Sequence, residues 1–146
     1  MLDDNKSLVR RFYDECWNKG QVERLGDIVA KECRYHDAVF PALTSGIDSL
    51  KRHIGMCRTA FPDLKFTIDD VIAERDEVVV HWTAQGTQEG AFLGIPASRK
   101  AGTVGGTSIY RVTGGKISEQ FSDWNLLTLL EQLGVSTTPK VQVAAR

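Results

Sequence analysis

The stretch Lys116–Gly134, KISEQFSDWNLLTLLEQLG, places acidic and amide side chains where a predicted strand passes into a leucine-rich helix. Alternate side chains of a strand share one face. One face of this strand is expected to form a wall of a reactive site, and it carries Glu119, Phe121, Asp123 and Asn125. A buried carboxylate can take a proton from a carbon acid and return it. Asp123 is a candidate for this role as general acid and base.

Asp123 and Asn125 also suit a structural role. Their side-chain oxygens can accept the free backbone N–H groups of a helix that begins at Leu126. Thr128 and Glu131 offer a second possible cap for the same helix. Capping and chemistry therefore both remain open for these side chains, although an amide cannot exchange protons as a carboxylate does.

Two of the three histidines are candidates for catalysis. His81, in VVVHWTAQG, shares a strand face with Thr83 and Gln85, and this face is predicted to line a pocket or to be exposed and hydrogen-bonded. His36, in CRYHDAVFP, can titrate near neutrality and polarise a carbonyl, or can simply bond loop backbone at a strand end.

Three further residues are assigned by position. Tyr35 and Asp37 share a strand face and are predicted substrate contacts, as is Phe92 in a glycine-rich loop that is expected to move on binding. His53, on a predicted helix surface, receives no role. The histidines show no metal-ligand spacing, so no metal site is predicted.

Periodicity outlines the elements that position these residues. Apolar side chains at helical spacing predict an amphipathic helix through Leu8–Trp17, a short second helix through Val22–Val29, and a third over Asp48–Ala60. A strand is expected over Cys33–Phe40.

Alternating patterns then predict further strands around Leu64–Ile68, Val78–Ala84 and Thr107–Val112, with hairpin turns at Arg75–Asp76 and Thr113–Gly115. This order gives an α+β fold in which a curved antiparallel sheet wraps N-terminal helices. Residues 1–146 form one domain, with 135–146 as a possible flexible tail or partner-binding arm.

Composition narrows the function classes. The chain has 146 residues and a formal net charge of −1, without a basic stripe, so no nucleic-acid partner is expected. No apolar run approaches membrane-spanning length and no signal core is present, so no membrane partner is expected and the protein is predicted to be cytoplasmic. The three widely spaced cysteines, Cys16, Cys33 and Cys57, are expected to be buried free thiols.

Several short motifs occur in a characteristic order. They are Tyr35–Asp37, AFPDL at Ala60–Leu64, the loop Gly86–Pro96, IYRV at Ile109–Val112, GKI at Gly115–Ile117, and LLEQLG at Leu129–Gly134. In order and spacing this set resembles the SnoaL-like polyketide cyclases, often labelled ester cyclases, within the NTF2-like cone fold.

The resemblance implies a conical pocket for a hydrophobic small molecule, a homodimer, and no metal or organic cofactor. It also implies ring closure by an intramolecular aldol step, with an Asp as general acid and base and a His assisting.

This chain departs from the family pattern at several polar positions. The family's E-x-W-x-x-x-D, laid on Glu119, places Phe121 at the Trp position and Asn125 at the Asp position. Gln88 stands where the family's G-T-H loop has His, and Ser108 stands where a strand His is common.

Three functions therefore stay open. The first is a cofactor-free cyclase or isomerase that acts on a carbonyl compound, and the second is a binding module that has kept the pocket and lost the chemistry. The third is an epoxide hydrolase of the limonene type, for which Tyr35 and Asp37 resemble the water-binding pair in position. The Arg and second Asp of that enzyme would fall near His81 and Thr83, so its acid-Arg-acid relay is absent.

Overall fold

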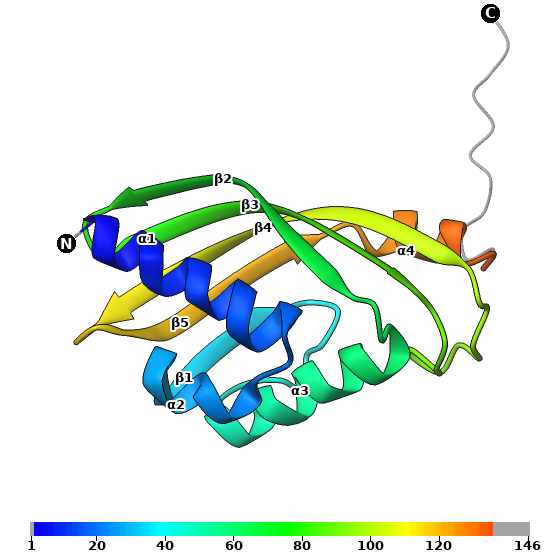
Figure 1. Ribbon diagram of the computed structural model, residues 1–146, viewed down its shortest axis with the longest axis horizontal. Coiled ribbons are helices and arrows are strands. Elements are labelled where there is room, and N and C mark those ends of the chain that lie inside the picture. Colours follow the sequence, from blue (N-terminus) through cyan, green and yellow to red (C-terminus); the bar gives the residue numbers. More distant parts are fainter. Residues whose placement is uncertain (1, 136–146) are drawn as a thin grey trace, which may run out of the picture.

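The computed structural model describes residues 2–135, which form a curved five-stranded sheet with helices packed against one face (Figure 1). The predicted tail falls, apart from residue 135, outside the described residues. Within 2–135 no helix is long and apolar enough to cross a membrane.

The N-terminal helix changes geometry along its length. α1 (Leu2–Arg11) continues into a π-helical segment, η1 (Phe12–Asn18). The N–H of Lys19 bonds the Asp14 carbonyl at 3.1 Å, five residues back, which is the wider turn of a π-helix. Both adjacent pairs in this segment, Phe12–Tyr13 and Cys16–Trp17, are buried. The predicted amphipathic helix is therefore present, but its second half buries a broader face than a regular α-helix does.

The second predicted helix is shorter than its apolar pattern indicated. A 3₁₀ turn, η2 (Val22–Arg24), leads into α2 (Leu25–Ile28), and the strand β1 (Val29–Asp37) begins at once. The expectation that the helix continues through Val29 is wrong. Val29 pairs instead with Ile117 of the last strand, because the parallel partner captures this segment as sheet.

The rest of the chain follows the predicted order. α3 (Ile47–Ala60) ends before Pro62, and the strands are β2 (Lys65–Glu74), β3 (Glu77–Thr87), β4 (Ala101–Thr113) and β5 (Lys116–Trp124). The last helix is α4 (Leu126–Gln132). Both predicted hairpin turns lie where the sequence placed them, between β2 and β3 and between β4 and β5.

The sheet is mixed rather than wholly antiparallel. Its strand order is β1-β5-β4-β3-β2, with β1 parallel to β5 and every other neighbouring pair antiparallel. The α+β class and the cone are confirmed, since α1, α2 and α3 lie on one side of the curved sheet (Figure 1). The hydrophobic core fills the space between these helices and the inner face of the sheet.

Candidate functional site

An apolar cavity of about 120 Å³ lies between the inner face of the sheet and the helices. Its walls are mainly aromatic. The rings that line it belong to Tyr13, Trp17, Tyr35, Phe40, Phe61, Phe66, Trp82, Phe92, Tyr110 and Trp124. Flat, apolar walls with few polar groups are typical of a small-molecule site.

A β-bulge in β5 decides which of its side chains reach this cavity. Val112 of β4 pairs with Ile117, whereas its neighbour Arg111 pairs with Glu119, so Ser118 is an extra residue in β5. Ile117 faces the core and is buried. Beyond the bulge the alternation is reset, and the inward side chains are Gln120, Ser122 and Trp124.

Polar side chains form a row across the inner face of three neighbouring strands. Ser108 of β4 is the register partner of Ser122 of β5, and Ser122 is the register partner of Asp37 of β1. All three line the cavity. Because neighbouring strands lie about 4.8 Å apart, the row joins a carboxylate to a pair of hydroxyls within one site.

Asp37 is held by two donors. Its Oδ2 accepts a hydrogen bond of 3.1 Å from Trp124 Nε1, and its Oδ1 accepts one of 2.9 Å from the Val39 N–H. Burial raises the pKa of the Asp37 carboxyl above its ordinary value, and these hydrogen bonds oppose part of that rise. The result is a fixed carboxylate that is more basic than a free aspartate.

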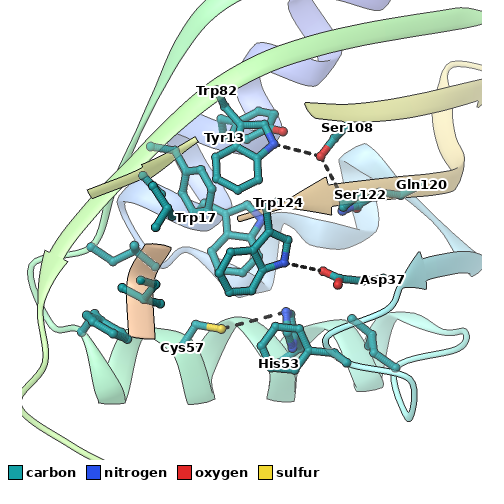
Figure 2. A pocket seen from close by; sticks show the side chains of 18 of the residues that line it. Tyr13, Trp17, Asp37, His53, Cys57, Trp82, Ser108, Gln120, Ser122 and Trp124 are labelled. Atoms are coloured by element: carbon teal, nitrogen blue, oxygen red, sulfur yellow. Dashed lines mark hydrogen bonds between the residues drawn. The ribbon is translucent and has the colours of Figure 1, made fainter. Parts of the chain in front are cut away.

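His53 and Cys57 of α3 lie at the same end of the cavity (Figure 2). His53 Nε2 is 3.9 Å from Cys57 Sγ. Burial lowers the pKa of His53 to about 4 and raises the pKa of the Cys57 thiol to about 12. Near neutral pH both side chains are therefore uncharged, and the thiol is a poor nucleophile.

A second polar group lies farther along the sheet, around Ser108 (Figure 2). Ser108 Oγ accepts a 3.0 Å hydrogen bond from Trp82 Nε1 and lies 2.7 Å from Ser122 Oγ. Ser122 Oγ also accepts from Gln120 Nε2 at 2.9 Å. Close by, the hydroxyls of Tyr13 and Tyr110 are 2.5 Å apart.

Three of the predicted substrate-binding residues line the cavity: Tyr35, Asp37 and Phe92. Tyr35 is buried, and its hydroxyl donates to the Gly46 carbonyl at 3.2 Å. Phe92 is buried and contacts the ring of Phe61 edge-on.

The predicted catalytic residues Asp123 and His81 do not line this cavity. Asp123 is exposed, because the Ser118 bulge turns it to the outer face of the sheet. His81 is exposed as well and lies 3.9 Å from Asp70, while Val80 and Trp82 on either side point inward. The strand face of His81 was predicted either to line a pocket or to be exposed and hydrogen-bonded. The structure matches the second alternative, since Thr83 on this face donates to Asp69 at 2.6 Å.

Three more of the predicted site residues, His36, Glu119 and Phe121, meet in a cluster on the outer face. Glu119 Oε2 bonds His36 Nε2 at 2.8 Å, and its Oε1 lies 3.2 Å from both Arg34 and Arg111. The Phe121 ring stacks on His36 at 4.3 Å. The Glu119 pKa is lowered, first by the His36 hydrogen bond and then by the two guanidinium charges. The cluster links β1 to β5. His36 is also one of the residues that line the aromatic cavity, whereas Glu119 and Phe121 do not line it.

The fold has close counterparts among proteins of known structure. TsrD from Streptomyces laurentii matches at a TM-score of 0.84 and 30% identity, covering 92% of this chain and 97% of TsrD. A protein from Acidithiobacillus ferrooxidans, provisionally described as a polyketide cyclase, matches at 0.82 and 25%, covering 90% and 94%. IdmH from Streptomyces antibioticus, described in the same provisional way, matches at 0.77 and 25%, covering 90% and 99%. A comparison with curated protein sequences finds no match.

The family model of the SnoaL-like polyketide cyclases matches residues 7–133. The chain belongs to this family. The expected family and cone fold are thereby confirmed.

In this SnoaL-like chain, Gln88 and Ser108 stand where the family pattern has histidines, and both make hydrogen bonds with neighbouring residues. Gln88 is fully buried, and its amide bonds the Gly90 carbonyl, the Ile95 carbonyl and the Ser98 N–H, each at 3.1 Å. These three bonds connect separate parts of the glycine-rich loop to one another. Ser108, at the other such position, belongs to the polar group in the cavity.

At the family's Asp position the SnoaL-like chain has a helix cap. Asn125 is exposed, and its Oδ1 accepts from the Thr128 N–H at 3.0 Å as the N-cap of α4. The capping interpretation of Asn125 is confirmed. The carboxylate that the cavity does contain comes from a different strand, β1.

Sequence reasoning missed several residues of the cavity. His53 was assigned to a helix surface, although it lies three residues after Leu50 and four before Cys57, on the buried stripe of α3. That spacing was a usable signal. Ser122 and Trp124 were missed because they sit on the strand face opposite the one expected to line the site. Among residues 2–135 no group of three or more metal-binding side chains is placed to hold a metal ion.

Proposed function

We propose that this SnoaL-like protein catalyses cofactor-free proton transfer at a carbon next to a carbonyl group, leading to intramolecular aldol ring closure. Asp37 is the general base and acid. One observation carries the proposal: within residues 2–135, Asp37 is the one Asp or Glu side chain that lines the aromatic cavity, and burial raises its pKa.

The proposed reaction needs no co-reactant. The Asp37 carboxylate takes a proton from the carbon beside the carbonyl, and the C–H electron pair passes into an enolate. The enolate carbon attacks a second carbonyl of the same molecule and forms the new C–C bond. The resulting alkoxide recovers the proton from Asp37, so the substrate is isomerised and the enzyme is restored.

The surroundings of Asp37 suit this cycle. Trp124 and the Val39 N–H hold the carboxylate in one orientation, which reduces the entropy lost on reaching the transition state. His53 and Cys57 add no charge near neutral pH, because burial favours their neutral forms. The apolar walls exclude water from a reactive enolate.

The test is hydrogen exchange at the α-carbon of simple aryl ketones. Acetophenone and 1-phenylbutane-1,3-dione are incubated in D₂O with the protein, and loss of the α-proton signal is followed by NMR. Wild type is expected to accelerate exchange of at least one of them above the buffer rate, and Asp37→Asn to abolish that acceleration. Removal of a catalytic base costs about 10²–10⁴-fold in rate.

Asp123→Asn tests the other candidate carboxylate, which is exposed on the outer face. It should keep the acceleration, with its acid limb moved to lower pH, because the Asp123 charge contributes to the raised pKa of Asp37. Full activity in Asp37→Asn, or its loss in Asp123→Asn, contradicts the assignment of the base. Tight binding of both ketones by wild type without any exchange supports the alternative, a binding module that has lost the chemistry.

A further inference from the structure

We propose that the buried hydroxyls of Tyr13, Ser108, Tyr110 and Ser122 form a binding site for a carbonyl oxygen. These four residues are called the hydroxyl cluster below. The inference rests on the proposed function and extends it, because it places the carbonyl of the substrate and thereby names a substrate class.

The hydroxyl cluster is a built site within the cavity wall. None of its four residues is more than 7% exposed, and all four line the cavity. Ser108 and Ser122 come from neighbouring strands in register, while Tyr13 reaches in from η1. Two N–H groups, from Trp82 and Gln120, donate to the two serine oxygens and hold them in place.

The hydroxyl cluster has more hydrogens than it can use internally. Each hydroxyl brings one hydrogen and two lone pairs. Two links join these hydroxyls to one another, Ser108–Ser122 and Tyr13–Tyr110, and each link uses one hydrogen. Two of the four hydroxyl hydrogens are therefore not used by these links, and an acceptor atom of a ligand in the cavity can take one of them.

The surplus hydrogen favours an acceptor as ligand. Burial raises the pKa of Tyr13 and of Tyr110, so both phenols stay protonated and remain donors. No carboxylate belongs to the hydroxyl cluster, which makes it a poor site for a cation. An uncharged carbonyl oxygen, or the enolate oxygen that forms from it, fits a group of neutral donors in an apolar wall.

The position of the hydroxyl cluster relative to the proposed base fits the same reaction. Ser122 is the register partner of Asp37, about 4.8 Å away across the sheet. A carbonyl bound by Ser122 therefore turns its neighbouring carbon toward the carboxylate. Beside these two groups the cavity is lined by aromatic rings, including Trp82 and Trp124, which fit a flat ring (Figure 2). The substrate class is an aryl ketone or another carbonyl attached directly to a planar ring.

The experiment compares two probes of nearly the same shape. 4-(Dimethylamino)benzaldehyde has a carbonyl acceptor and no α-hydrogen, and N,N-dimethyl-4-vinylaniline replaces that oxygen by carbon. Wild type is expected to bind the aldehyde about two- to ten-fold more tightly, the value of one neutral hydrogen bond. The absorption band of the aldehyde should also move to longer wavelength on binding, because a hydrogen bond to its oxygen stabilises the charge-transfer state.

Two variants locate the donor. Ser122→Ala and Tyr13→Phe each remove one hydroxyl, and both are expected to reduce the preference for the aldehyde and the band shift. Ser118→Ala is the matched control, because the Ser118 hydroxyl pairs with Thr113 at the exposed end of the same strand. Circular dichroism checks that each variant is folded, and if one is not, the other still decides.

Equal affinity of wild type for the two probes, or a preference that survives in both variants, would overturn the assignment. The aldehyde cannot undergo α-exchange, so this result is independent of catalysis. A band shift that is retained in Asp37→Asn, together with no α-exchange in wild type, would refute the proposed function and leave the carbonyl site standing.

Discussion

Trp124 Nε1 lies 3.1 Å from Asp37 Oδ2, so an indole from the end of β5 steadies the one carboxylate that lines the cavity among the described residues. A hydrogen bond to the charged form of a carboxyl favours that form and lowers the pKa. The indole therefore restrains the rise in pKa that burial imposes on Asp37.

Trp124→Phe should raise the pKa of Asp37 further, because the ring stays apolar while the donor is lost. Carbon-13 NMR of the aspartate carboxyls measures the titration directly, and the acid limb of the α-exchange rate should move to higher pH with it. Trp17→Phe is the control, since Trp17 also lines the cavity and makes no hydrogen bond with Asp37. An unchanged Asp37 titration in Trp124→Phe would show that the 3.1 Å contact has no electrostatic effect.

Asp37 and Asp63 should make opposite contributions to the pH dependence of stability. The pKa of Asp37 is raised in the folded protein, so the protonated side chain is favoured by folding. The stabilisation that Asp37 gives relative to Asn is therefore complete below the unfolded pKa of about 3.9 and is lost as pH rises through the folded pKa. The pKa of Asp63 is lowered, chiefly by the Thr87 N–H at 2.7 Å, so its contribution is present above about pH 3.9 and is lost as pH falls.

Urea unfolding of wild type, Asp37→Asn and Asp63→Asn between pH 3 and 7 tests both signs. The free energy of unfolding of wild type minus that of Asp37→Asn should decrease with pH, and the corresponding difference for Asp63→Asn should increase. Two differences that run in the same direction would contradict the environment described for one of these residues.

Gly106→Ala should damage the cavity wall. Gly106 pairs with Trp82 on one side and Trp124 on the other, and a Cβ at this position would overlap the Trp82 ring and lie 2.7 Å from Trp124 Cβ. Overpacking of this kind costs about 1–3 kcal/mol. The variant should unfold at lower urea and bind the aldehyde probe more weakly.

Gly105→Ala is the neighbouring control. A Cβ at Gly105 would meet only the Trp82 carbonyl oxygen, at 3.7 Å, which is ordinary contact. Its stability should lie within about 0.5 kcal/mol of wild type. Equal effects of the two substitutions would mean that strand propensity, rather than the fit between the two tryptophans, governs this position.

Gln88→Ala should loosen the glycine-rich loop. The change removes the Gln88 partner of the Gly90 carbonyl and of the Ser98 N–H, at about 1–3 kcal/mol for a buried unsatisfied group, while the Ile95 carbonyl still accepts from the Phe92 N–H. Amide hydrogen exchange should quicken at Ser98. In Glu89→Ala, which breaks the exposed 2.6 Å ion pair with Arg99, the loss should stay below about 1 kcal/mol. If the loop exchanges no faster in Gln88→Ala than in Glu89→Ala, the glutamine does not hold it.

The fold could be predicted because its signals are local and repeated. The stripe of Leu50, Ile54 and Cys57 defines α3, and Gly114–Gly115 marks the hairpin before β5. Where the prediction failed, a distant partner decided the outcome. Val29 continues a helical pattern, yet it is strand because Ile117 pairs with it.

The candidate site was harder to predict, because one residue sets the direction of a whole strand. Glu119, Phe121 and Asp123 do share a face, as alternation required. The bulge at Ser118 turns that face outward and turns Ser122 and Trp124 inward. Nothing in the serine itself distinguishes a bulge from a regular strand position, since the extra residue is defined only by the register with β4.

The chain contains three tryptophans, Trp17, Trp82 and Trp124, and all three line the same cavity. Its intrinsic fluorescence therefore arises entirely from side chains that a ligand would touch. Quenching or a spectral shift on mixing with a compound would report occupancy of the cavity without a label, an engineered reporter or a known reaction. A library of aryl carbonyl compounds can thus be screened directly on the unmodified protein.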